Sequence, residues 1–302
     1  MYKKRQSDYS ARKRAVDMRC ARSLRKRATK FFFRRLIQDV KHNKIRPFHI
    51  DEKGLWFKTK YGFSVYSNLK DRILELDVNA TWEEMESTFI ANNVNEGAVF
   101  VDVGANIGYF SMLAAQQKVG KVLAIEPIPG TYDMLRRNVE RNLFSDVIEP
   151  LNIALGSKEH TVKFVCSLGP KNHIEYEVDN VHRDLPTIDV NVTTLDNLLK
   201  DKEGIDRIDV IKVDIEGAEY SFLQGARKTL ETFKPIIMME IEEHRLVKYN
   251  VTADKIFTFM TDLGYKYLSV TEDSITEGNT YTEDLKMGRD FIFYTCNHNL
   301  VY

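Results

Sequence analysis

The part of the sequence that most restricts the fold is an apolar run leading into a loop with two glycines. Residues 98–103 are apolar except for Asp102, as expected for a strand that is covered on both faces. The loop, residues 102–108, reads Asp-Val-Gly-Ala-Asn-Ile-Gly, and a helical segment over residues 109–117 follows it directly. A strand, a glycine loop and a helix in this order predict the first unit of a parallel α/β sheet.

Strand-like and helical segments alternate through the rest of the chain. Further buried strands are expected over residues 122–126, 148–154, 208–213 and 235–241. Helices are expected over residues 131–142, 219–229 and 253–263. The strands at residues 265–270 and 291–295 have no helix between them, which predicts an antiparallel hairpin at the edge. We therefore expect a doubly wound, Rossmann-like α/β sheet of seven strands, mostly parallel.

The charge divides the chain into unequal parts. Residues 1–46 hold 17 Lys and Arg against three acids, a net charge of +14, so the remainder carries −14 in a chain of net charge zero. Because residues 10–40 contain no Pro or Gly, we expect a basic helical arm. The arm fits a solvated helix that packs its Phe-rich end on the core, a contact to nucleic acid or an anionic membrane surface, or an organelle transit peptide.

A short region connects the arm to the core, and we place its limits at residues 47–94, with the core domain over residues 95–302. Residues 55–57 and 63–66 alternate like the strands of a hairpin, with Tyr61 and Gly62 at the turn. Thr81 and Glu84 have the spacing of a capping box, which predicts a helix that runs to Asn92.

Composition excludes several classes of protein. No apolar run approaches the roughly 18 residues of a membrane-spanning helix, and the N-terminus has no secretory core. Cys20, Cys166 and Cys296 are far apart and have no zinc-site spacing, so neither a disulfide framework nor a structural zinc is expected. A reducing, cytoplasmic location is the expectation. The sequence leaves the oligomeric state open.

The glycine loop has the features of a ligand site. In a doubly wound sheet the ligand lies beyond the carboxyl ends of the strands, where Asp102, Gly104, Asn106 and Gly108 are expected. Gly104 permits a sharp exit from the strand, Asn106 tolerates positive φ, and the next helix offers free N–H groups to an anion. The spacing is not the dinucleotide pattern G-x-G-x-x-G. Alone, the loop also fits a tight turn without a ligand.

The second strand strengthens the case for a nucleotide-like ligand. It ends in Glu126, 22 residues after Gly104, and an acid there can accept hydrogen bonds from both hydroxyls of a ribose. Pro127 and Pro129 then stiffen the exit from the strand. We therefore predict that Glu126 binds a ribose.

Five motifs in order resemble the FkbM family of methyltransferases over residues 95–241, about half the chain. They occupy residues 100–109, 124–127, 151–155, 192–196 and 211–219. The resemblance implies a class I methyltransferase fold, S-adenosylmethionine as methyl donor, and usually O-methylation of carbohydrate or polyketide-type acceptors. It assigns the cofactor to Asp102, Gly104, Asn106, Gly108 and Glu126, with the adenine end near Asn152 and Ala154. Asn106 replaces the middle glycine of the generic methyltransferase motif, as in the FkbM version.

Methyl transfer to an oxygen requires alignment in line with the methyl group, exclusion of water and often removal of a proton. Asp214, at the end of a buried strand, is the leading candidate, as base or as a group that positions cofactor or acceptor. Glu216 and His244 are further catalytic candidates. Glu216 and Glu219 also fit acids in the first turn of a helix, and His244 a surface histidine. No spacing of the nearby acids demands a metal, so none is expected.

The favoured function is thus an S-adenosylmethionine-dependent methyltransferase that modifies a glycan or another small hydroxylated acceptor. One alternative is a methyltransferase acting on nucleic acid, for which the basic arm is the only support. A nicotinamide-dependent oxidoreductase is disfavoured by the missing dinucleotide pattern. A module that binds the cofactor without turnover is the remaining alternative.

Overall fold

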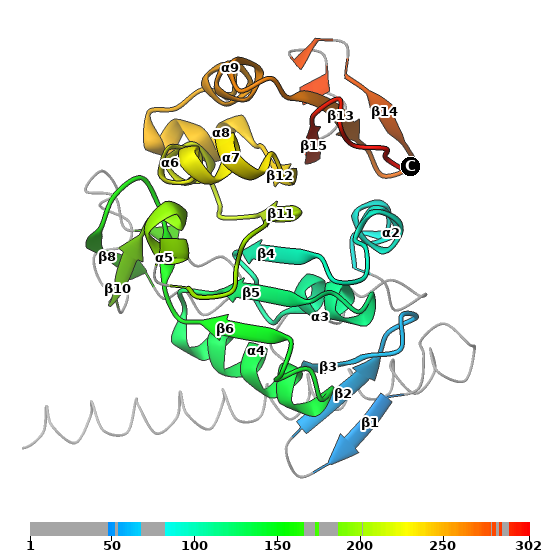
Figure 1. Cartoon of the computed structure of the whole chain (residues 1–302). Helices are drawn as coiled ribbons and strands as arrows, with labels where there is room; N and C mark the ends of the chain where they lie inside the picture. The colour runs from blue at the N-terminus through cyan, green and yellow to red at the C-terminus, as the bar shows by residue number, and fades with distance from the viewer. Residues whose placement is uncertain are drawn as a thin grey trace, which may run out of the picture.

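The computed structural model describes residues 48–51, 54–67, 82–165, 173–174, 187–200, 202–278, 280–281, 284–285 and 290–302. The predicted arm, residues 1–46, lies outside the described residues. An eight-stranded sheet forms the centre of the molecule (Figure 1). Its order is β14 (Ile275–Glu277), β13 (Lys266–Val270), β15 (Asp290–Tyr294), β12 (Ile236–Glu240), β11 (Val210–Val213), β4 (Val99–Val103), β5 (Lys121–Ile125) and β6 (Ile148–Leu151).

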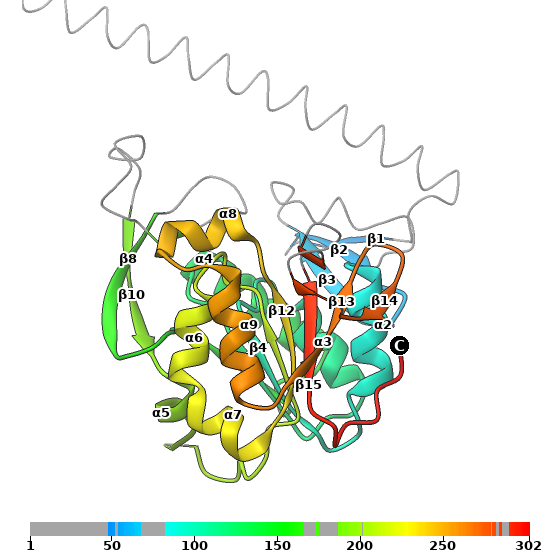
Figure 2. The same ribbon diagram turned by 90° about the horizontal axis from the view of Figure 1, so that it is seen from above.

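The five strands from β12 to β6 are parallel, and successive residues along each one point to opposite faces. Phe100 and Val210 pack on one face, under α2 (Glu84–Asn93), α3 (Tyr109–Gln116) and α4 (Pro129–Arg141). Val101 and Val213 pack on the other face, under α6 (Glu219–Gly225), α7 (Arg227–Phe233) and α9 (Ala253–Asp262). Figure 2 shows α6, α7 and α9 on one side of the strands and α2 and α3 on the other. Burial on both faces explains why β4, β11 and β12 are largely apolar, whereas β6 at the edge is only partly buried and contains Glu149 and Pro150.

Two smaller sheets flank the central one. A four-stranded sheet has the order β7 (Ala154–Leu155), β10 (Thr187–Thr193), β8 (His160–Val165) and β9 (His173–Ile174). A three-stranded antiparallel sheet contains β1 (Phe48–Asp51), β2 (Gly54–Lys58) and β3 (Ser64–Ser67). The predicted hairpin is confirmed as β2 and β3, whereas β1 was not predicted.

The prediction of seven strands is wrong, because the described part of the sheet has eight. The additional strand, β14, has only three residues and none of them is fully buried, so it leaves no apolar run in the sequence. The strands near residues 265–270 and 291–295 do pair antiparallel, as predicted. However, β15 lies between β12 and β13 and is antiparallel to both, so this pair is not confined to the edge.

Two helix predictions also need correction. The expected helix over residues 219–229 is two helices, α6 and α7, which meet at Ala226. A Cβ on Gly225 would lie 1.9 Å from the carbonyl oxygen of Gly156, so this close backbone approach sets the position of the break. The predicted capping box is wrong, because the residue before α2 is Glu83, with a left-handed φ of 45° and no side-chain cap.

The remaining short elements are α5 (Leu195–Lys200), α8 (Glu243–Leu246) and the 3₁₀ helix η2 (Val247–Tyr249). Within the described residues, no helix has both the length and the apolar character needed to cross a bilayer. The division of the chain at residues 46 and 94 stays a prediction.

Candidate active site

The loop between β4 and α3 is built on three residues with left-handed backbone. Gly104, Asn106 and Gly108 have φ values of 83°, 51° and 87°. A Cβ on Gly104 would lie 1.9 Å from the carbonyl oxygen of Asp214, and one on Gly108 would lie 2.3 Å from Leu135 Cδ1. The two glycines therefore let neighbouring segments approach the loop. Asn106 takes the positive φ expected of it, since asparagine adopts this conformation more readily than most residues.

Glu126, the residue after β5, turns its carboxylate into this loop. Its Oε2 accepts a hydrogen bond from the backbone N–H of Asn106 at 3.0 Å, and its Oε1 accepts one from Ile128 at 2.9 Å. Burial raises the pKa of Glu126 to about 7, although both hydrogen bonds act in the opposite direction. A carboxylate has about four lone-pair positions, so two remain for other donors.

Asp102 is buried and points toward α3. Ser111 Oγ donates a hydrogen bond of 2.6 Å to Asp102 Oδ2, which fastens the first turn of the helix to the end of β4. Burial raises the pKa of Asp102, while the positive charge of Lys212 opposes the rise. Lys212 stands directly opposite Asp102 in the pairing of β4 with β11.

Asn152 and Ala154 lie after β6. Asn152 Nδ2 donates to the backbone carbonyls of Glu126 and Pro127, both at 2.9 Å. It therefore fixes the chain that carries the Glu126 carboxylate. Ala154 begins β7 and pairs with Val192 on β10. Their predicted place at the adenine end of the cofactor stays a prediction.

Asp214 follows β11 at the same end of the sheet. Its backbone N–H donates to the carbonyl of Val103 at 3.0 Å, and Lys212 Nζ lies 3.3 Å from its Oδ2. Burial alone would raise the pKa of Asp214, but the charge of Lys212 and its hydrogen bond hold the pKa below the ordinary value. One third of the Asp214 side chain is exposed. The site therefore presents an ionised carboxylate that ligands can reach.

Lys212 is the first residue of this site that the sequence interpretation missed. Its side chain is almost completely buried, and Nζ lies 4.5 Å from the centre of the Phe110 ring. The carboxylates of Asp214, Glu83, Asp102 and Asp290 stabilise its positive charge and raise its pKa, against the effect of burial. A lone lysine within the apolar run over residues 208–213 was the available signal, because a buried ammonium needs compensating partners.

The turn after Asp214 has two residues with left-handed backbone and is fixed by the buried carboxylate of Glu219. Glu216 and Gly217 have φ values of 57° and 110°, and a Cβ on Gly217 would lie 2.8 Å from the carbonyl oxygen of Arg245. Glu219 Oε1 accepts a hydrogen bond of 2.9 Å from the N–H of Gly217. The other oxygen, Oε2, is buried and has no hydrogen bond of normal geometry to any described residue. Burial raises the pKa of Glu219 to about 7.

Arg245 is the second residue that the sequence interpretation missed. Its Nη1 lies 2.6 Å from Glu240 Oε2 and 2.9 Å from Glu216 Oε2, and its Nε pairs with Glu242. Only 15% of the Arg245 side chain is exposed, and this one guanidinium compensates carboxylates from the end of β12, from the residue before α8 and from the turn after Asp214. The only signal in the sequence was the density of acids over residues 240–243, which demands a cation nearby.

His244 lies at the solvent-exposed side of this network. Its side chain is 72% exposed, and Nε2 lies 3.7 Å from Glu242 Oε2. The structure thus brings Glu216 close to Asp214 through Arg245, while His244 faces solvent. Among the described residues, no group of three His, Cys, Asp or Glu side chains is arranged to hold a metal ion.

Two carboxylates with different properties therefore lie at one edge of the sheet. Glu126 has free lone pairs beside the backbone of the glycine loop, and Asp214 is kept ionised by Lys212. The two acids are close enough for the charge of Asp214 to raise the pKa of Glu126. The first can accept hydrogen bonds from hydroxyl groups, and the second can accept a proton or hold a polar group.

Comparison with known proteins points to the same region. Residues 102–267, more than half of the chain, match the family model described as the methyltransferase FkbM domain. The match begins at the residue where the glycine loop begins and includes β5, β11, β12 and part of β13.

Three similar proteins are methyltransferases by name. Methyltransferase sdnD of Sordaria araneosa is 31% identical over 160 residues, which are 44% of this chain and 62% of sdnD. The hexuronic acid methyltransferase AglP of Haloferax volcanii is 26% identical over 151 residues, which are 49% of this chain and 58% of AglP. The crystal structure of methyltransferase FkbM from Methylobacillus flagellatus KT superposes with a TM-score of 0.41 at 20% identity, covering 74% of this chain and 52% of that one. This chain covers less than two thirds of each of these proteins.

Proposed function

Since this chain belongs to the FkbM methyltransferase family, as its motifs predicted, we propose that it transfers a methyl group from S-adenosylmethionine to a hydroxyl oxygen. The acceptor we propose is a carbohydrate or another small hydroxylated molecule. The observation that carries the proposal is the Glu126 carboxylate, which is fixed by two backbone N–H groups and keeps lone pairs free beside the glycine loop. The name of AglP, a hexuronic acid methyltransferase, supports a sugar acceptor.

The donor fits the residues of the loop. Two ribose hydroxyls match the two free positions on Glu126, and Gly104 and Gly108 add no side-chain bulk along the loop backbone. The first-turn N–H groups of α3, which begins at Tyr109, suit the carboxylate of the methionine end. Asp102 and Asn152 act one step away, because they fix α3 and the chain that carries Glu126.

The chain's part in the reaction follows from where its charges lie. Bound S-adenosylmethionine supplies an electrophilic methyl group on a sulfonium that is its own leaving group. Asp214, ionised beside Lys212, accepts the proton of the acceptor hydroxyl or holds that hydroxyl in line as its oxygen bonds the methyl carbon. Glu216 pairs with Arg245 and so helps to fix the charges around Asp214. His244 is a candidate base only for an acceptor that reaches the solvent side of α8.

Calorimetry and methyl transfer test the proposal together. We expect the purified chain to bind S-adenosylmethionine and its demethylated product, and Glu126→Ala to weaken binding about tenfold or more, the cost of one buried hydrogen bond to a charged group. Glu231→Ala is the matched control, because Glu231 is a half-exposed acid on α7 that pairs with Arg227. Absence of binding to both compounds would contradict the donor assignment. Thermal stabilisation by NAD alone would favour the oxidoreductase.

A second assay tests the acceptor. Labelled S-adenosylmethionine is offered with uronic-acid glycans, neutral glycans and RNA as separate acceptors. We expect label in a glycan and none in RNA. Label in RNA alone would favour the nucleic-acid alternative, for which the predicted basic arm is the support.

The cytoplasmic location also stays a prediction.

A further inference from the structure

We propose that the three-stranded sheet of β1, β2 and β3 is a working part of the donor site and acts through Asn138, a positioning residue on α4. This sheet lies outside residues 102–267, the segment that matches the family model. The inference rests on the proposed placement of S-adenosylmethionine at the loop of residues 102–108.

Asn138 connects the sheet to the donor loop directly. Its side chain is fully buried between them. Oδ1 accepts a hydrogen bond of 2.8 Å from the backbone N–H of Tyr66 in β3, and Nδ2 donates one of 2.7 Å to the carbonyl of Ile107 in the loop. One amide group thus joins two segments that are 41 residues apart in sequence, from Tyr66 to Ile107.

The contact with Ile107 lies where the loop has left-handed residues on both sides. Ile107 lies between Asn106 and Gly108, which both have left-handed backbone. The neighbouring N–H of Asn106 is the one that Glu126 accepts. Because strained backbone persists only where surrounding contacts fix it, the hydrogen bond from Asn138 helps to hold the conformation in which this N–H faces Glu126.

The N–H of Tyr66 determines which way the Asn138 amide points. An amide group has one acceptor side and one donor side, so a donor at Tyr66 directs Nδ2 toward Ile107. Without that donor, a buried Oδ1 would be left unsatisfied, and a rotated amide would face the Ile107 carbonyl with another oxygen. β3 therefore acts on the loop through the orientation of the Asn138 amide.

Asn142, one turn later on α4, provides an internal comparison. Its Oδ1 accepts from the N–H of Ser64 at 2.7 Å, and its Nδ2 donates to the carbonyl of Ser64 at 2.8 Å. Asn142 thus binds the same edge of β3 as Asn138, and its Nδ2 also lies near Met112 Sδ and the carbonyl of Asn138. Among the described residues, its side chain forms no hydrogen bond with residues 102–108. It holds the sheet on α4 without a link to the cofactor.

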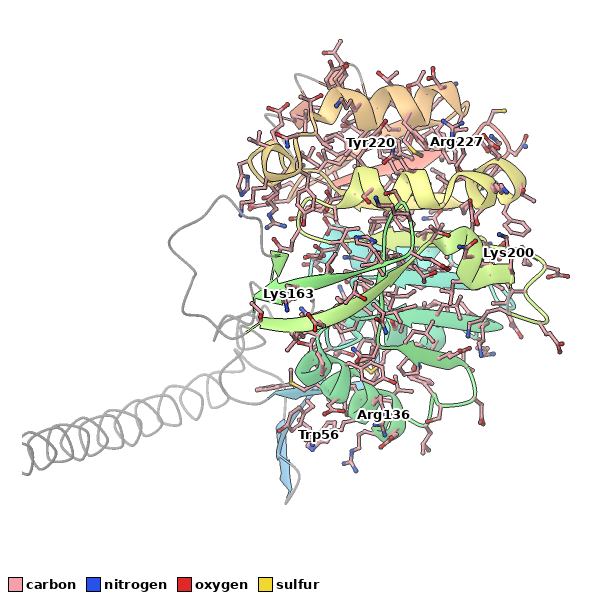
Figure 3. The ribbon with its side chains drawn as sticks, turned by 90° about the vertical axis from the view of Figure 1, so that its left-hand side faces the viewer. Trp56, Arg136, Lys163, Lys200, Tyr220 and Arg227 are labelled. Atoms are coloured by element: carbon pink, nitrogen blue, oxygen red, sulfur yellow. The ribbon has the colours of Figure 1, made fainter. Side chains whose placement is uncertain are left out.

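Aromatic and basic side chains complete the contact between the sheet and α4. Trp56 on β2 and Tyr66 on β3 meet edge to face, with 5.2 Å between ring centres. Arg141 and Arg137 lie 5.4 and 5.9 Å from the centres of these two rings. Figure 3 shows Trp56 beside α4, the helix that carries Arg136. The sheet is therefore fixed on α4 independently of the hydrogen bond that orients Asn138.

The decisive experiment compares Tyr66→Pro with Tyr66→Ala by calorimetry with S-adenosylmethionine. Both variants lose the ring, but only proline lacks the N–H that Asn138 accepts. This N–H points to α4 rather than to β2, so proline removes no hydrogen bond within the sheet. We expect the Kd of Tyr66→Pro to be about five to tenfold above that of Tyr66→Ala, as for one buried hydrogen bond. At saturating donor we expect equal kcat, because only donor binding is affected. Equal Kd values would overturn the proposal.

A second pair of variants decides the question if Tyr66→Pro does not fold. Asn138→Ala is expected to raise the Kd about tenfold, and Asn142→Ala less than about threefold, with thermal unfolding measured for both. Equal increases would overturn the role of Asn138. Glu126→Ala separates the two levels of the argument. If Glu126→Ala leaves the Kd for S-adenosylmethionine unchanged, the donor binds elsewhere and the proposed function fails with it. If Glu126→Ala raises the Kd but the variants at Asn138 and Tyr66 do not, only the role of Asn138 is refuted.

Discussion

The donor loop and the acidic edge around Asp214 lie side by side but are built differently. In the donor loop, the contacts are made mostly by backbone groups, since the N–H groups of Asn106 and Ile128 donate hydrogen bonds to the Glu126 carboxylate. Around Asp214, side-chain charges compensate one another, with Lys212 and Arg245 among the carboxylates of several elements. The conformation of the donor loop is thus set mainly by backbone geometry, and that of the acidic edge by ion pairs between side chains.

The contrast suggests a division of labour. A fixed loop suits a donor that stays the same in every reaction of a family. A network of side-chain charges that reaches solvent at Asp214 and Glu216 can accommodate different acceptors, because side chains can be exchanged with less change to the backbone. Predictions that separate shape from charge can therefore break or sharpen the comparison.

The largest effect is expected from Gly104→Ala. The new Cβ would lie 1.9 Å from the carbonyl oxygen of Asp214, so the two loops would have to separate. We expect a loss of about 3 kcal/mol or more in unfolding free energy and no measurable donor binding. Urea denaturation measures the loss. Gly97→Ala is the matched control, because Gly97 has a similar φ of 77° but no atom within 4 Å of its Cβ position, and about 1 kcal/mol is expected there. Equal losses would show that φ alone, not the contact with Asp214, decides.

Lys212→Met tests the charged edge. Without the ammonium, burial and the surrounding acids raise the pKa of Asp214, so the acid limb of the pH–rate profile moves to higher pH. At pH 6 we expect a roughly tenfold or greater loss of kcat that recovers as the pH rises. The charged groups that act on Asp214 are Lys212, Glu240, Arg245, Asp102, Glu126 and Glu219.

Lys202→Met is the control for this profile. Lys202 is a partly buried lysine that pairs with Glu149, away from the proposed site. Its profile should match that of the unchanged protein. A uniform loss of kcat in Lys212→Met, with no shift along the pH axis, would argue that Asp214 positions the acceptor and does not remove its proton.

Glu219→Gln is expected to stabilise the protein at high pH. The folded-state pKa of about 7 exceeds the ordinary 4.5, so the folded protein keeps a proton that the unfolded chain has lost. Stability from this group is therefore present at low pH and declines as the pH rises from about 4.5 to 7. Glutamine resembles the protonated form, and we expect about 1–2 kcal/mol more stability at pH 8 and little change at pH 5. Urea denaturation across this range would contradict the assignment if both proteins lost stability in parallel.

The smallest effect is expected from His244→Ala. Because the side chain is 72% exposed, we expect a loss of less than about 0.5 kcal/mol in unfolding free energy and a smaller loss of kcat than at Asp214. Asp214→Asn in the same transfer assay provides the comparison. A loss in His244→Ala as large as that in Asp214→Asn would make His244 the base and move the acceptor to the solvent side of α8.

Patterns of neighbouring residues in the sequence predicted most of the central sheet. Largely apolar runs identified the inner parallel strands β4, β11 and β12, since burial on both faces leaves such runs in the sequence. The three residues of β14 carry no such run and were missed. The break between α6 and α7 depends on Gly225 meeting Gly156, 69 positions earlier, and no local pattern records that contact.

The same distinction applies to the site. Gly104, Asn106 and Gly108 were predictable because their backbone requirements restrict residue type, and Glu126 because its distance along the chain follows from one strand–helix–strand unit. Arg245 and Asn138 were not predictable, since their importance comes from partners on other elements. Lys212 was visible as an isolated cation in an apolar strand, but its partners were known only from the structure.

The position of β15 has a consequence for how the chain is assembled. This strand is inserted between β12 and β13, so β13 has no place in the sheet until residues 290–294 have been synthesised. During synthesis on the ribosome, the strands from β4 to β12 can associate early, while β12 presents an open edge to which other chains can bind. Pairing of β15 with β12 therefore covers this edge and gives β13 a strand to pair with.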